Sequence, residues 1–307
     1  MNSSSSYKIL CFGEILWDIF HKDGHVSKVL GGAPSNLSYF FHKLGESAQS
    51  VSQVGDDELG LEAIQQLQSL QIPHIISTSN LPTGVVDIQI FDHEPRYLFQ
   101  TPAAWDEIPY SNAVKNAGSY ANLIAFGSLA QRNEQDKSTF STLLQILESN
   151  PYATRFLDLN LRAPYFTKER ILALLKLADI LKINFEEFQY LKSLFNLDSF
   201  STRDALFQLI QQLNLNFIIL TLGSEGSIVM SETDYSAQSI QKIRLEDTVG
   251  AGDAFSAAFL TALNRGASFE NAHIFANRFS SYICTQKGAF APIPESFKDE
   301  LATFSAW

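Results

Sequence analysis

Cysteine is nearly absent from this 307-residue chain, which contains only Cys11 and Cys284. Two thiols so far apart, in no CxxC spacing, exclude a disulfide framework and a thiolate zinc site. No apolar run reaches the length of about 18 residues that spans a bilayer, so the sequence predicts no membrane helix. The first residues, MNSSSSYK, lack the basic and apolar regions of a secretory signal, and we therefore expect a cytoplasmic protein.

Basic residues are also scarce, because 22 Lys and Arg stand against 33 Asp and Glu and give a net charge of −11. Such a chain is repelled by nucleic acid and by anionic membranes, so we expect neither as a partner. A phosphate compound could bind only through local geometry. The histidines have no metal-ligand spacing and are expected on the surface or on helices; they are His21, His25, His42, His74, His93 and His273.

The first hundred residues are predicted to supply a small β layer beside the main fold. Tyr7–Leu16 reads as a strand buried on both faces. Helical patterns cover Pro34–Leu44 and Asp57–Leu70. Short stretches rich in β-branched and aromatic residues alternate with turn signals; they are His25–Leu30, His74–Thr78, Val85–Phe91 and Arg96–Gln100.

From Asn122 onward the pattern alternates regularly between strands and helices. The predicted strands are Leu123–Phe126, Thr154–Leu157, Ile180–Ile183 and Asn216–Leu220. The predicted helices are Glu134–Glu148, Lys168–Leu177, Glu186–Phe195, Arg203–Leu213, Ala254–Asn264 and Phe269–Gln286. A hairpin of Gly226–Met230 and Ser236–Gln241 is expected at a sheet edge. The fold class is α/β: a mostly parallel sheet with helices on both faces. We expect one domain, 1–307, with the small β layer inserted within about 20–33 and 74–101.

The strongest functional signal is the segment Asp247-Thr248-Val249-Gly250-Ala251-Gly252-Asp253, which runs directly into an apolar helix. Its glycines leave backbone N–H groups uncovered, and the helix start carries a partial positive charge. Together these features predict an anion site. The alternative is that Asp253 only caps the helix while the glycines only form a turn.

Phosphoryl transfer needs this combination, because donors must surround the transferred group while a base meets the attacking hydroxyl. Both lie between Gly250 and Asp253. Other phosphate-binding patterns are missing: the sequence has no GxxxxGK[ST], no complete GxGxxG and no HRD with DFG. P-loop enzymes, dinucleotide dehydrogenases and protein kinases are therefore not supported.

Asp247–Asp253 resembles the C-terminal signature of the PfkB, or ribokinase-type, carbohydrate kinases. Gly31-Gly32-Ala33-Pro34-Ser35-Asn36, with Gly45 following, is similar to the N-terminal signature of that family. The resemblance implies a ribokinase-like domain with a small β-sheet lid. It also implies ATP-dependent phosphorylation of a sugar hydroxyl, with Asp253 as base and with Gly250, Ala251 and Gly252 as the anion hole.

On the sugar side, the resemblance implies contacts from Asp18, Gly32 and Asn36. For Asp18 the alternative is a solvated acid at a strand end. Asp158-Leu159-Asn160-Leu161-Arg162 resembles the DxNxR stretch of the fructokinase and 2-keto-3-deoxygluconate kinase branches. Its Asp158, Asn160 and Arg162 are candidate substrate contacts, and Arg162 could hold either a substrate carboxylate or a phosphate. Tyr97, Phe99 and Trp105 could form an aromatic wall against the sugar or belong to the lid core.

On the nucleotide side, Asn184 and Glu187 fit the family's NxxE pattern, which is associated with Mg²⁺ through water. An ordinary helix cap with acids in the first turn explains the same pattern. The resemblance implies a nucleotide loop at Thr221, Gly223 and Gly226, and adenine or ribose contacts at Asn277 and Gly288. Asp247 and the Val249 carbonyl match a monovalent-cation site, for K⁺, that is found in part of the family.

The sugar predicted from these residues is fructose. Ribokinases typically carry a lysine in the loop that reads GGAPSN here, and keto-acid relatives often carry a basic residue near Gln100-Thr101. The alternatives are a 2-keto-3-deoxygluconate kinase, another sugar kinase of the family, or a sugar-binding regulator without turnover. Because the lid strands carry apolar residues, a second copy of the chain could pair with them in a homodimer.

Overall fold

The computed structural model describes residues 8–22, 25–91, 94–133, 138–240 and 242–304. Tyr7, His93, Gln241 and the first four residues of the predicted helix Glu134–Glu148 lie outside these ranges. The chain divides into two compact units: unit 1 takes in 1–39, 47–124 and 130–153, and unit 2 takes in 40–46, 125–129 and 154–307. No helix in the described ranges combines the length and the apolar character needed to cross a membrane.

In unit 1, three parallel strands pair in the order β1-β4-β5. Their bounds are Lys8–Phe12 for β1, Ser47–Gly55 for β4 and His74–Ser79 for β5. The single predicted strand Tyr7–Leu16 is wrong in its length, because the chain turns at Gly13, where φ is +150°, and separates β1 from β2. β4 was not predicted from the sequence. Its serines and glutamines hide the strand, although Ala48 and the stretch from Ser50 to Gly55 are buried.

A second sheet in unit 1 has the strand order β3-β2-β6-β7 and confirms the predicted small β layer. The strands are β2 (Leu16–Lys22), β3 (His25–Gly31), β6 (Gly84–Phe91) and β7 (Glu94–Phe99). β2 pairs antiparallel with β3 and parallel with β6. The stretch His74–Thr78 does not belong to this layer. Its backbone pairs with β4 in the parallel sheet. The second insertion that forms the small sheet therefore begins at Gly84 and not at His74.

The small sheet leaves large apolar side chains exposed, namely Val26, Val29, Tyr97 and Leu98. Val29 and Tyr97 lie on one face, whereas Val26 and Leu98 lie on the other, as the strand register requires. Exposed apolar side chains of this kind could be covered by a second copy of the chain. The homodimer stays a prediction.

Unit 1 also contains helices, the first of which continues into unit 2. Their bounds are Ala33–Lys43 for α1, Glu58–Ser69 for α2, Asn112–Ser119 for α3 and Thr139–Ser149 for α4, with short helices at Ala104–Glu107 and Leu129–Gln131. α2 begins where the predicted pattern does, because the Asp57 carboxylate accepts a hydrogen bond from the Gly60 N–H at 2.8 Å. α3 was not predicted. The division between the units falls within α1 and within β8 (Leu123–Gly127).

Unit 2 holds strands that pair in the order β13-β12-β11-β10-β9. They are β9 (Thr154–Asp158), β10 (Ile180–Asn184), β11 (Phe217–Thr221), β12 (Ser227–Ser231) and β13 (Tyr235–Gln238). β9, β10 and β11 are parallel, and β12 and β13 form an antiparallel hairpin at the edge. The predicted strands and the mostly parallel character of the sheet are confirmed. The edge hairpin is confirmed as well, although its second strand is Tyr235–Gln238 instead of Ser236–Gln241.

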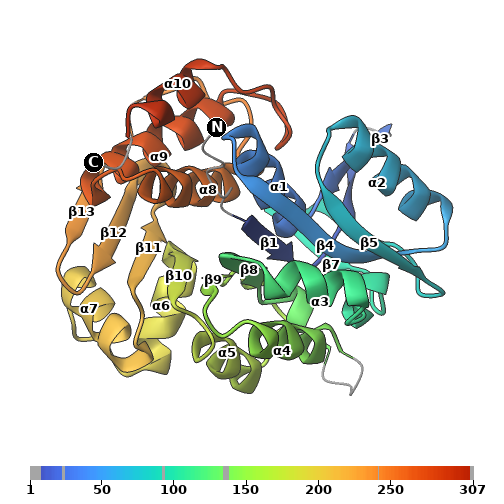
Figure 1. Ribbon diagram of the computed structural model, residues 1–307, viewed down its shortest axis with the longest axis horizontal. Coiled ribbons are helices and arrows are strands. Elements are labelled where there is room, and N and C mark those ends of the chain that lie inside the picture. The colour runs from blue at the N-terminus through green and yellow to red at the C-terminus, as the bar shows by residue number, and fades with distance from the viewer. Residues whose placement is uncertain (1–7, 23–24, 92–93, 134–137, 241, 305–307) are drawn as a thin grey trace. The chain divides into compact units, whose positions relative to one another are not determined.

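Helices cover both faces of this part of the sheet. They are α5 (Lys168–Leu175), α6 (Phe185–Leu194), α7 (Thr202–Leu213), α8 (Ala251–Asn264), α9 (Phe269–Cys284) and α10 (Ser296–Ala302). In Figure 1, α6 and α7 lie on one side of the strands and α8 and α9 on the other. Phe217 of β11 meets Phe259 of α8 with ring centroids 5.5 Å apart. Residues Phe217 to Leu220 of β11 are all buried, which requires cover on both faces.

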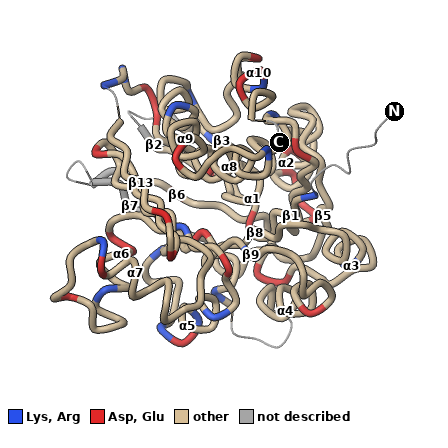
Figure 2. The backbone as a smooth tube through the Cα atoms, turned by 60° about the vertical axis from the view of Figure 1, so that its left-hand side comes forward, with Lys and Arg blue, Asp and Glu red and all other residues tan. Residues whose placement is uncertain are grey.

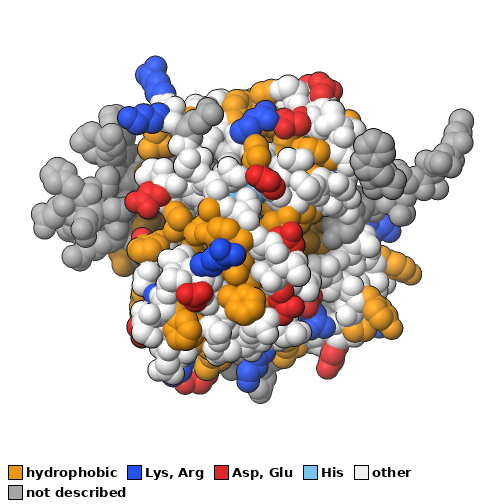
Figure 3. All heavy atoms as spheres, turned by 90° about the vertical axis from the view of Figure 1, so that its left-hand side faces the viewer, with side chains coloured by type: hydrophobic (Ala, Val, Ile, Leu, Met, Phe, Trp, Pro, Cys, Tyr) orange, Lys and Arg blue, Asp and Glu red, His pale blue; other side chains and the backbone are white. Residues whose placement is uncertain are grey.

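Charged residues are spread over the outer helices of unit 2. Figure 2 shows basic and acidic positions interspersed along α5, α6 and α7. Figure 3 looks onto the side of unit 2 where β13 lies, and hydrophobic side chains there are mixed with charged ones of both signs. Arg203 places its guanidinium 4.7 Å from the ring centroid of Tyr235 on β13. This mixture is typical of a solvated helix surface.

A buried polar cluster joins α9 to the edge hairpin of unit 2. The His273 ring nitrogens lie 2.8 Å from the hydroxyls of Ser227 and Ser236. The Ser227 hydroxyl also donates to the Asn277 side-chain oxygen at 2.8 Å. Burial lowers the pKa of His273 from 6.5 to about 4, so the ring is neutral at pH 7.

We expect His273 to make the protein sensitive to mild acid. Its pKa is lower in the folded than in the unfolded state, so the stability it contributes is complete above pH 6.5 and is lost as the pH falls toward 4. The loss should be on the order of 3 kcal/mol. Chemical denaturation of wild type and His273→Gln between pH 7.5 and 4 measures it. The unfolding free energy of the variant should fall less steeply with decreasing pH than that of wild type. The same pH dependence in both proteins would contradict the prediction.

Candidate active site

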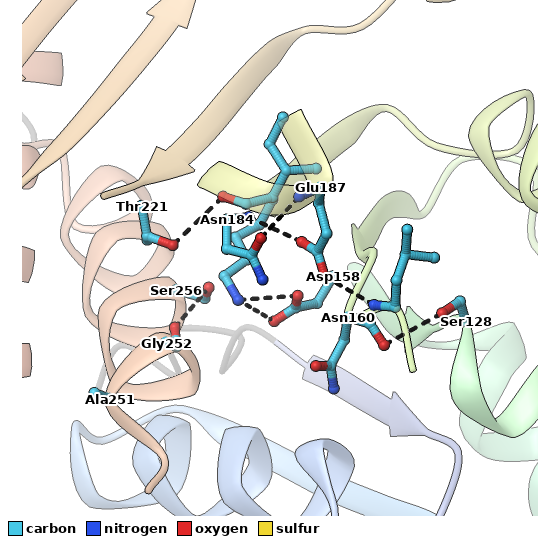
Figure 4. A network of polar contacts seen from close by, with 12 residues as sticks. Ser128, Asp158, Asn160, Asn184, Glu187, Thr221, Ala251, Gly252 and Ser256 are labelled. Atoms are coloured by element: carbon cyan, nitrogen blue, oxygen red, sulfur yellow. Dashed lines mark hydrogen bonds and ion pairs between the residues drawn. The ribbon is translucent and has the colours of Figure 1, made fainter. Parts of the chain in front are cut away.

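The candidate site in unit 2 lies where three parallel strands end. β9 ends at Asp158, β10 at Asn184 and β11 at Thr221. Asn184 pairs with Thr221 in the register, so their strands end at the same level. In open α/β sheets, ligands bind at the carboxyl ends of such strands. Figure 4 shows Asp158, Asn184 and Glu187 gathered beside the first turns of α8.

A buried ion pair lies at the centre of this group. The Lys182 ammonium donates to both carboxylate oxygens of Asp158 at 3.0 Å, and the two side chains are 11% and 3% exposed. The two residues are paired directly across β9 and β10, which directs both side chains to the same face. Burial opposes the charge on Lys182, but Asp158, Glu187 and Asp253 together raise its pKa. The ammonium is therefore charged at pH 7.

The sequence prediction missed Lys182 and assigned Asp158 to the sugar. The available signal was a lysine inside the apolar strand Ile180–Asn184. A lysine that is only 9% exposed requires a partner of opposite charge.

Asn184 and Glu187 form a reciprocal cap at the start of α6. The Asn184 side chain accepts from the Glu187 N–H at 2.9 Å, and the Glu187 carboxylate accepts from the Asn184 N–H at 2.8 Å. The other Glu187 oxygen accepts from the Leu161 N–H at 2.8 Å. Burial, aided by Asp158, raises the pKa of Glu187. The cap that the sequence offered as the alternative reading is therefore present.

These contacts suit a metal held through water better than a direct protein cage. Each Glu187 oxygen already accepts one backbone N–H, which leaves a lone pair for a metal-bound water. The described part of the chain contains no group of three or more His, Cys, Asp or Glu placed to hold a metal ion. Mg²⁺ keeps several waters and binds nucleotide phosphates, so these residues fit it from the second coordination layer.

The start of α8 has the backbone geometry that an anion site needs. Gly250 caps the helix with φ +77° and without a side-chain hydrogen bond. The Ala251 N–H donates to the Thr248 carbonyl at 3.2 Å, so this member of the predicted anion hole is occupied. Over the described residues, the Gly252 N–H has no backbone acceptor. It lies in the first turn, where N–H groups point toward a ligand.

Asp253 occupies the first turn of the same helix and is partly exposed. Its negative charge acts on Lys182, because it is one of the three carboxylates that raise the pKa of that lysine. An acid at this position can accept a proton while adjacent N–H groups oppose negative charge on a neighbouring group. The geometry therefore suits transfer of an anionic group to a hydroxyl.

The predicted nucleotide residues also lie in unit 2. The Thr221 hydroxyl donates to the Ile183 carbonyl at 3.4 Å. Gly223 has φ +58°, and a Cβ built there would meet no atom within 4 Å, so this loop faces open space. A Cβ at Gly226 would approach the Gln238 carbonyl oxygen to 1.9 Å, so this glycine is structural. Asn277 is 8% exposed, and its side-chain nitrogen has no hydrogen-bond partner in the described residues.

Asp247 connects two loops of unit 2. Its carboxylate accepts from the Val249 N–H at 3.0 Å and from the Gly288 N–H at 3.0 Å. Each carboxylate oxygen therefore accepts one backbone N–H. These bonds place Gly288 beside the start of Asp247–Asp253, which we call the anion segment. This gives Asp247 a structural role, and its predicted part in a cation site with the Val249 carbonyl stays a prediction.

The DxNxR segment follows β9. Asn160 adopts φ +43°, and its carbonyl accepts from the Ser128 hydroxyl at 3.4 Å, as Figure 4 shows. Arg162 donates to the carbonyl of its neighbour Leu161 at 3.0 Å and is partly exposed. Its guanidinium is partly exposed and remains able to meet an anion.

The other predicted sugar residues lie in unit 1, and three of them share one face of the small sheet. Asp18 pairs with Val86 and Val86 pairs with Phe99, while Tyr97 lies two residues along the same strand. The Gly32 backbone passes so close to Glu14 that a Cβ would lie 2.4 Å from its carbonyl oxygen. Asn36 is 5% exposed and its N–H donates to the Gly32 carbonyl at 3.2 Å.

Whereas Tyr97 is 50% exposed, Trp105 is buried and only 1% exposed. Arg132 covers its ring with the guanidinium carbon 3.9 Å from the centroid. Arg132 is itself held by both oxygens of Asp106, at 2.7 and 2.9 Å. The structure favours the core alternative for Trp105.

The chain is similar to known proteins over nearly its whole length. Residues 7–296 match the pfkB family of carbohydrate kinases. The chain is 28% identical to "Probable fructokinase-7" of Arabidopsis thaliana over 310 residues, covering 93% of this chain and 89% of that protein. A fructokinase of Vibrio cholerae O395, solved in its fructose, ADP and calcium ion bound form, has a TM-score of 0.80 at 23% identity, covering 97% of this chain and 100% of that one.

A sugar kinase of Pyrococcus horikoshii, PH1459, solved in complex with ATP, also has a TM-score of 0.80. Its identity is 22%, and the match covers 95% of this chain and 99% of that one. The fold is therefore ribokinase-like. It has the mostly parallel sheet and the small β layer that the sequence predicted, and that layer is a sheet of four strands. The chain belongs to the pfkB family of carbohydrate kinases. The family resemblance inferred from the two motifs is confirmed.

Gly250 and Gly288 form a matched pair for testing the anion segment. Their φ angles are +77° and +74°, but a Cβ at Gly250 would lie 2.8 Å from the Ala289 Cβ, whereas at Gly288 nothing lies within 4 Å. Gly288→Ala should cost about 1–2 kcal/mol of unfolding free energy, the penalty for a left-handed residue. Gly250→Ala should cost clearly more, because a clash is added. Equal losses in urea denaturation would contradict this account.

Proposed function

We propose that the protein phosphorylates a hexose hydroxyl with ATP, converting D-fructose to fructose 6-phosphate. The observation that carries the proposal is Asp253 in the first turn of α8, directly after the left-handed cap at Gly250. In this reaction the sugar hydroxyl oxygen forms a bond to the γ-phosphorus, and the bond from that phosphorus to the bridging oxygen of ATP breaks. The Asp253 carboxylate accepts the hydroxyl proton, and the electron pair leaves with ADP.

The start of α8 opposes the negative charge on the transferred group. The Gly252 N–H and the helix dipole supply fixed positive potential, which needs no reorganisation during transfer. Of the predicted anion hole, Gly250, Ala251 and Gly252, the middle amide already donates to Thr248. We therefore assign the larger part of this charge stabilisation to the Gly252 N–H.

ATP and Mg²⁺ are the proposed cofactors. Glu187 and Asn184 would hold metal-bound water through the lone pairs that the cap leaves, and Mg²⁺ would neutralise phosphate charge when bound. Gly223 and Gly288 would border the nucleotide, since both face open space. The monovalent-cation proposal draws support from a Vibrio cholerae fructokinase variant that was solved in a potassium ion bound form.

Fructose is favoured over an acidic sugar by the charges in unit 1. Arg132 lies beside the segment where keto-acid relatives carry a basic residue, because its guanidinium donates to the Gln100 carbonyl at 2.7 Å. That cation is already neutralised by Asp106. Asp18, a carboxylate on the same sheet face as Tyr97, suits hydroxyl groups and would repel a substrate carboxylate. Several relatives are fructokinases by name, which agrees with this choice.

A coupled assay of ADP release across a panel of sugars tests the proposal. We expect turnover to be highest with fructose, and 2-keto-3-deoxygluconate tests the acidic alternative. Binding of a sugar without any ADP release would support the alternative of a sugar-binding regulator and would refute the kinase assignment.

Asp253→Asn should lower kcat by roughly 10²–10⁴-fold, because a positioned base is lost. The fold and the affinity for ATP should stay close to wild type. Asp204→Asn is the matched control, since Asp204 also occupies the first turn of a helix in unit 2, and it should leave kcat unchanged. A kcat of Asp253→Asn near that of wild type would remove Asp253 from the role of base.

Arg162→Ala separates the two substrate classes. With fructose there is no substrate carboxylate to bind, so Arg162 should oppose charge that develops during transfer, and kcat should fall more than KM rises. With 2-keto-3-deoxygluconate the variant should chiefly raise KM for the acid. Arg203→Ala, on the outer surface of α7, is the control. Unchanged kcat and KM with both substrates would exclude Arg162 from the site.

A further inference from the structure

Lys182 lies directly beneath the anion segment of α8. A Cβ built on Gly252 would lie 3.0 Å from the Lys182 Nζ and 3.5 Å from its Cε. The ammonium is thus adjacent to the backbone that carries the Gly252 N–H. A Cβ at this position would lie closer to the ammonium than an ordinary van der Waals contact, so glycine fits best. The sequence motif accounts for this glycine by its free amide, and the structure adds the approach of a buried cation.

Lys182 carries one positive charge, whereas three acidic side chains lie near it in this part of unit 2. Asp158, Glu187 and Asp253 all act on it and raise its pKa. A phosphoryl group that approached three carboxylates without this cation would be repelled. The ammonium has three N–H donors, and Asp158 takes two of them at 3.0 Å. Asp158 therefore fixes the position of Lys182 without using all of its donors.

We propose that Lys182 is a further catalytic residue, which binds the transferred phosphoryl group from below Gly252, and that Asp158 is its positioning residue. The inference rests on the proposed phosphotransfer. The third N–H of Lys182 meets a phosphoryl oxygen as the bond to the sugar oxygen forms and the bond to ADP breaks. The proton of the sugar hydroxyl still passes to Asp253, so Lys182 keeps its own protons throughout.

This assignment changes the expected role of Asp158. A sugar contact at Asp158 would affect KM for the sugar when removed, whereas an anchor for Lys182 affects kcat. The competing explanation is that the pair only neutralises itself inside the fold. Removing one partner of a buried pair typically costs about 3–5 kcal/mol, but replacing both with neutral residues of similar size is often tolerated. The double variant therefore separates stability from catalysis.

The experiment compares wild type, Lys182→Met, the double variant Asp158→Asn with Lys182→Met, and the control Lys176→Met, which removes an exposed lysine of unit 2. For each protein, kcat and the sugar KM are measured together with the unfolding free energy. Calorimetry then compares the affinity for MgADP with sugar in the absence and presence of aluminium fluoride, which mimics the transferred phosphoryl group.

We expect the double variant to recover most of the stability that Lys182→Met loses. Its kcat should nevertheless stay about 10²-fold or more below wild type, as when an oxyanion donor is removed. The sugar KM and the affinity for MgADP alone should change little, and the tightening by aluminium fluoride should be lost. The control should match wild type in every measurement.

Two results would overturn the inference while leaving the kinase assignment intact. One is a double variant whose kcat returns to the wild-type value, and the other is unchanged tightening by aluminium fluoride. Absence of wild-type turnover on every sugar would overturn the proposed function and this inference together. The wild-type assay therefore distinguishes the two kinds of failure.

Discussion

The register between β9, β10 and β11 is the constraint on which the candidate site depends. It pairs Lys182 with Asp158 and Asn184 with Thr221. Because side chains alternate along a strand, a shift of one residue would turn Lys182 away from Asp158 and leave two charges buried without partners. The apolar residues between the polar ones oppose the same shift. Ion pair and packing thus specify one register, and that register brings the polar strand ends together.

The electrostatics of the site contrast with those of the whole chain. A net charge of −11 opposes the binding of a nucleotide, and three carboxylates lie near Lys182. Binding of an anion therefore has to come from short-range sources, namely the N-terminus of α8 and the Lys182 ammonium. Burial shields the Lys182 ammonium from salt, and salt weakens distant surface charges much more than adjacent ones. Local geometry can in this way reverse the sign of the overall field.

Much of the fold could be predicted from the sequence, because most helices and strands of unit 2 have clear apolar periodicity and capping residues. The motif at Asp247–Asp253 and the loop at Gly31–Asn36 were sufficient for the family. β4 could not be predicted, since its buried serines look polar in sequence. The ion pair between Lys182 and Asp158 could not be predicted either, because it depends on which residue of β9 lies opposite Lys182. A motif placed Asp158 near a substrate and aromatic character suggested the same for Trp105, but only packing shows what each side chain contacts.

Gly252 illustrates why one residue type can satisfy several demands at once. Its N–H lies in the first turn of α8 without a backbone acceptor among the described residues, and its missing Cβ leaves room for the Lys182 ammonium. A Cβ there would preserve the N–H but would lie only 3.0 Å from the ammonium, a tighter contact than is usual. The start of α8 and the strand beneath it thus supply a free amide and a cation at adjacent positions. This proximity links a residue of β10 to a glycine 70 positions later in the chain.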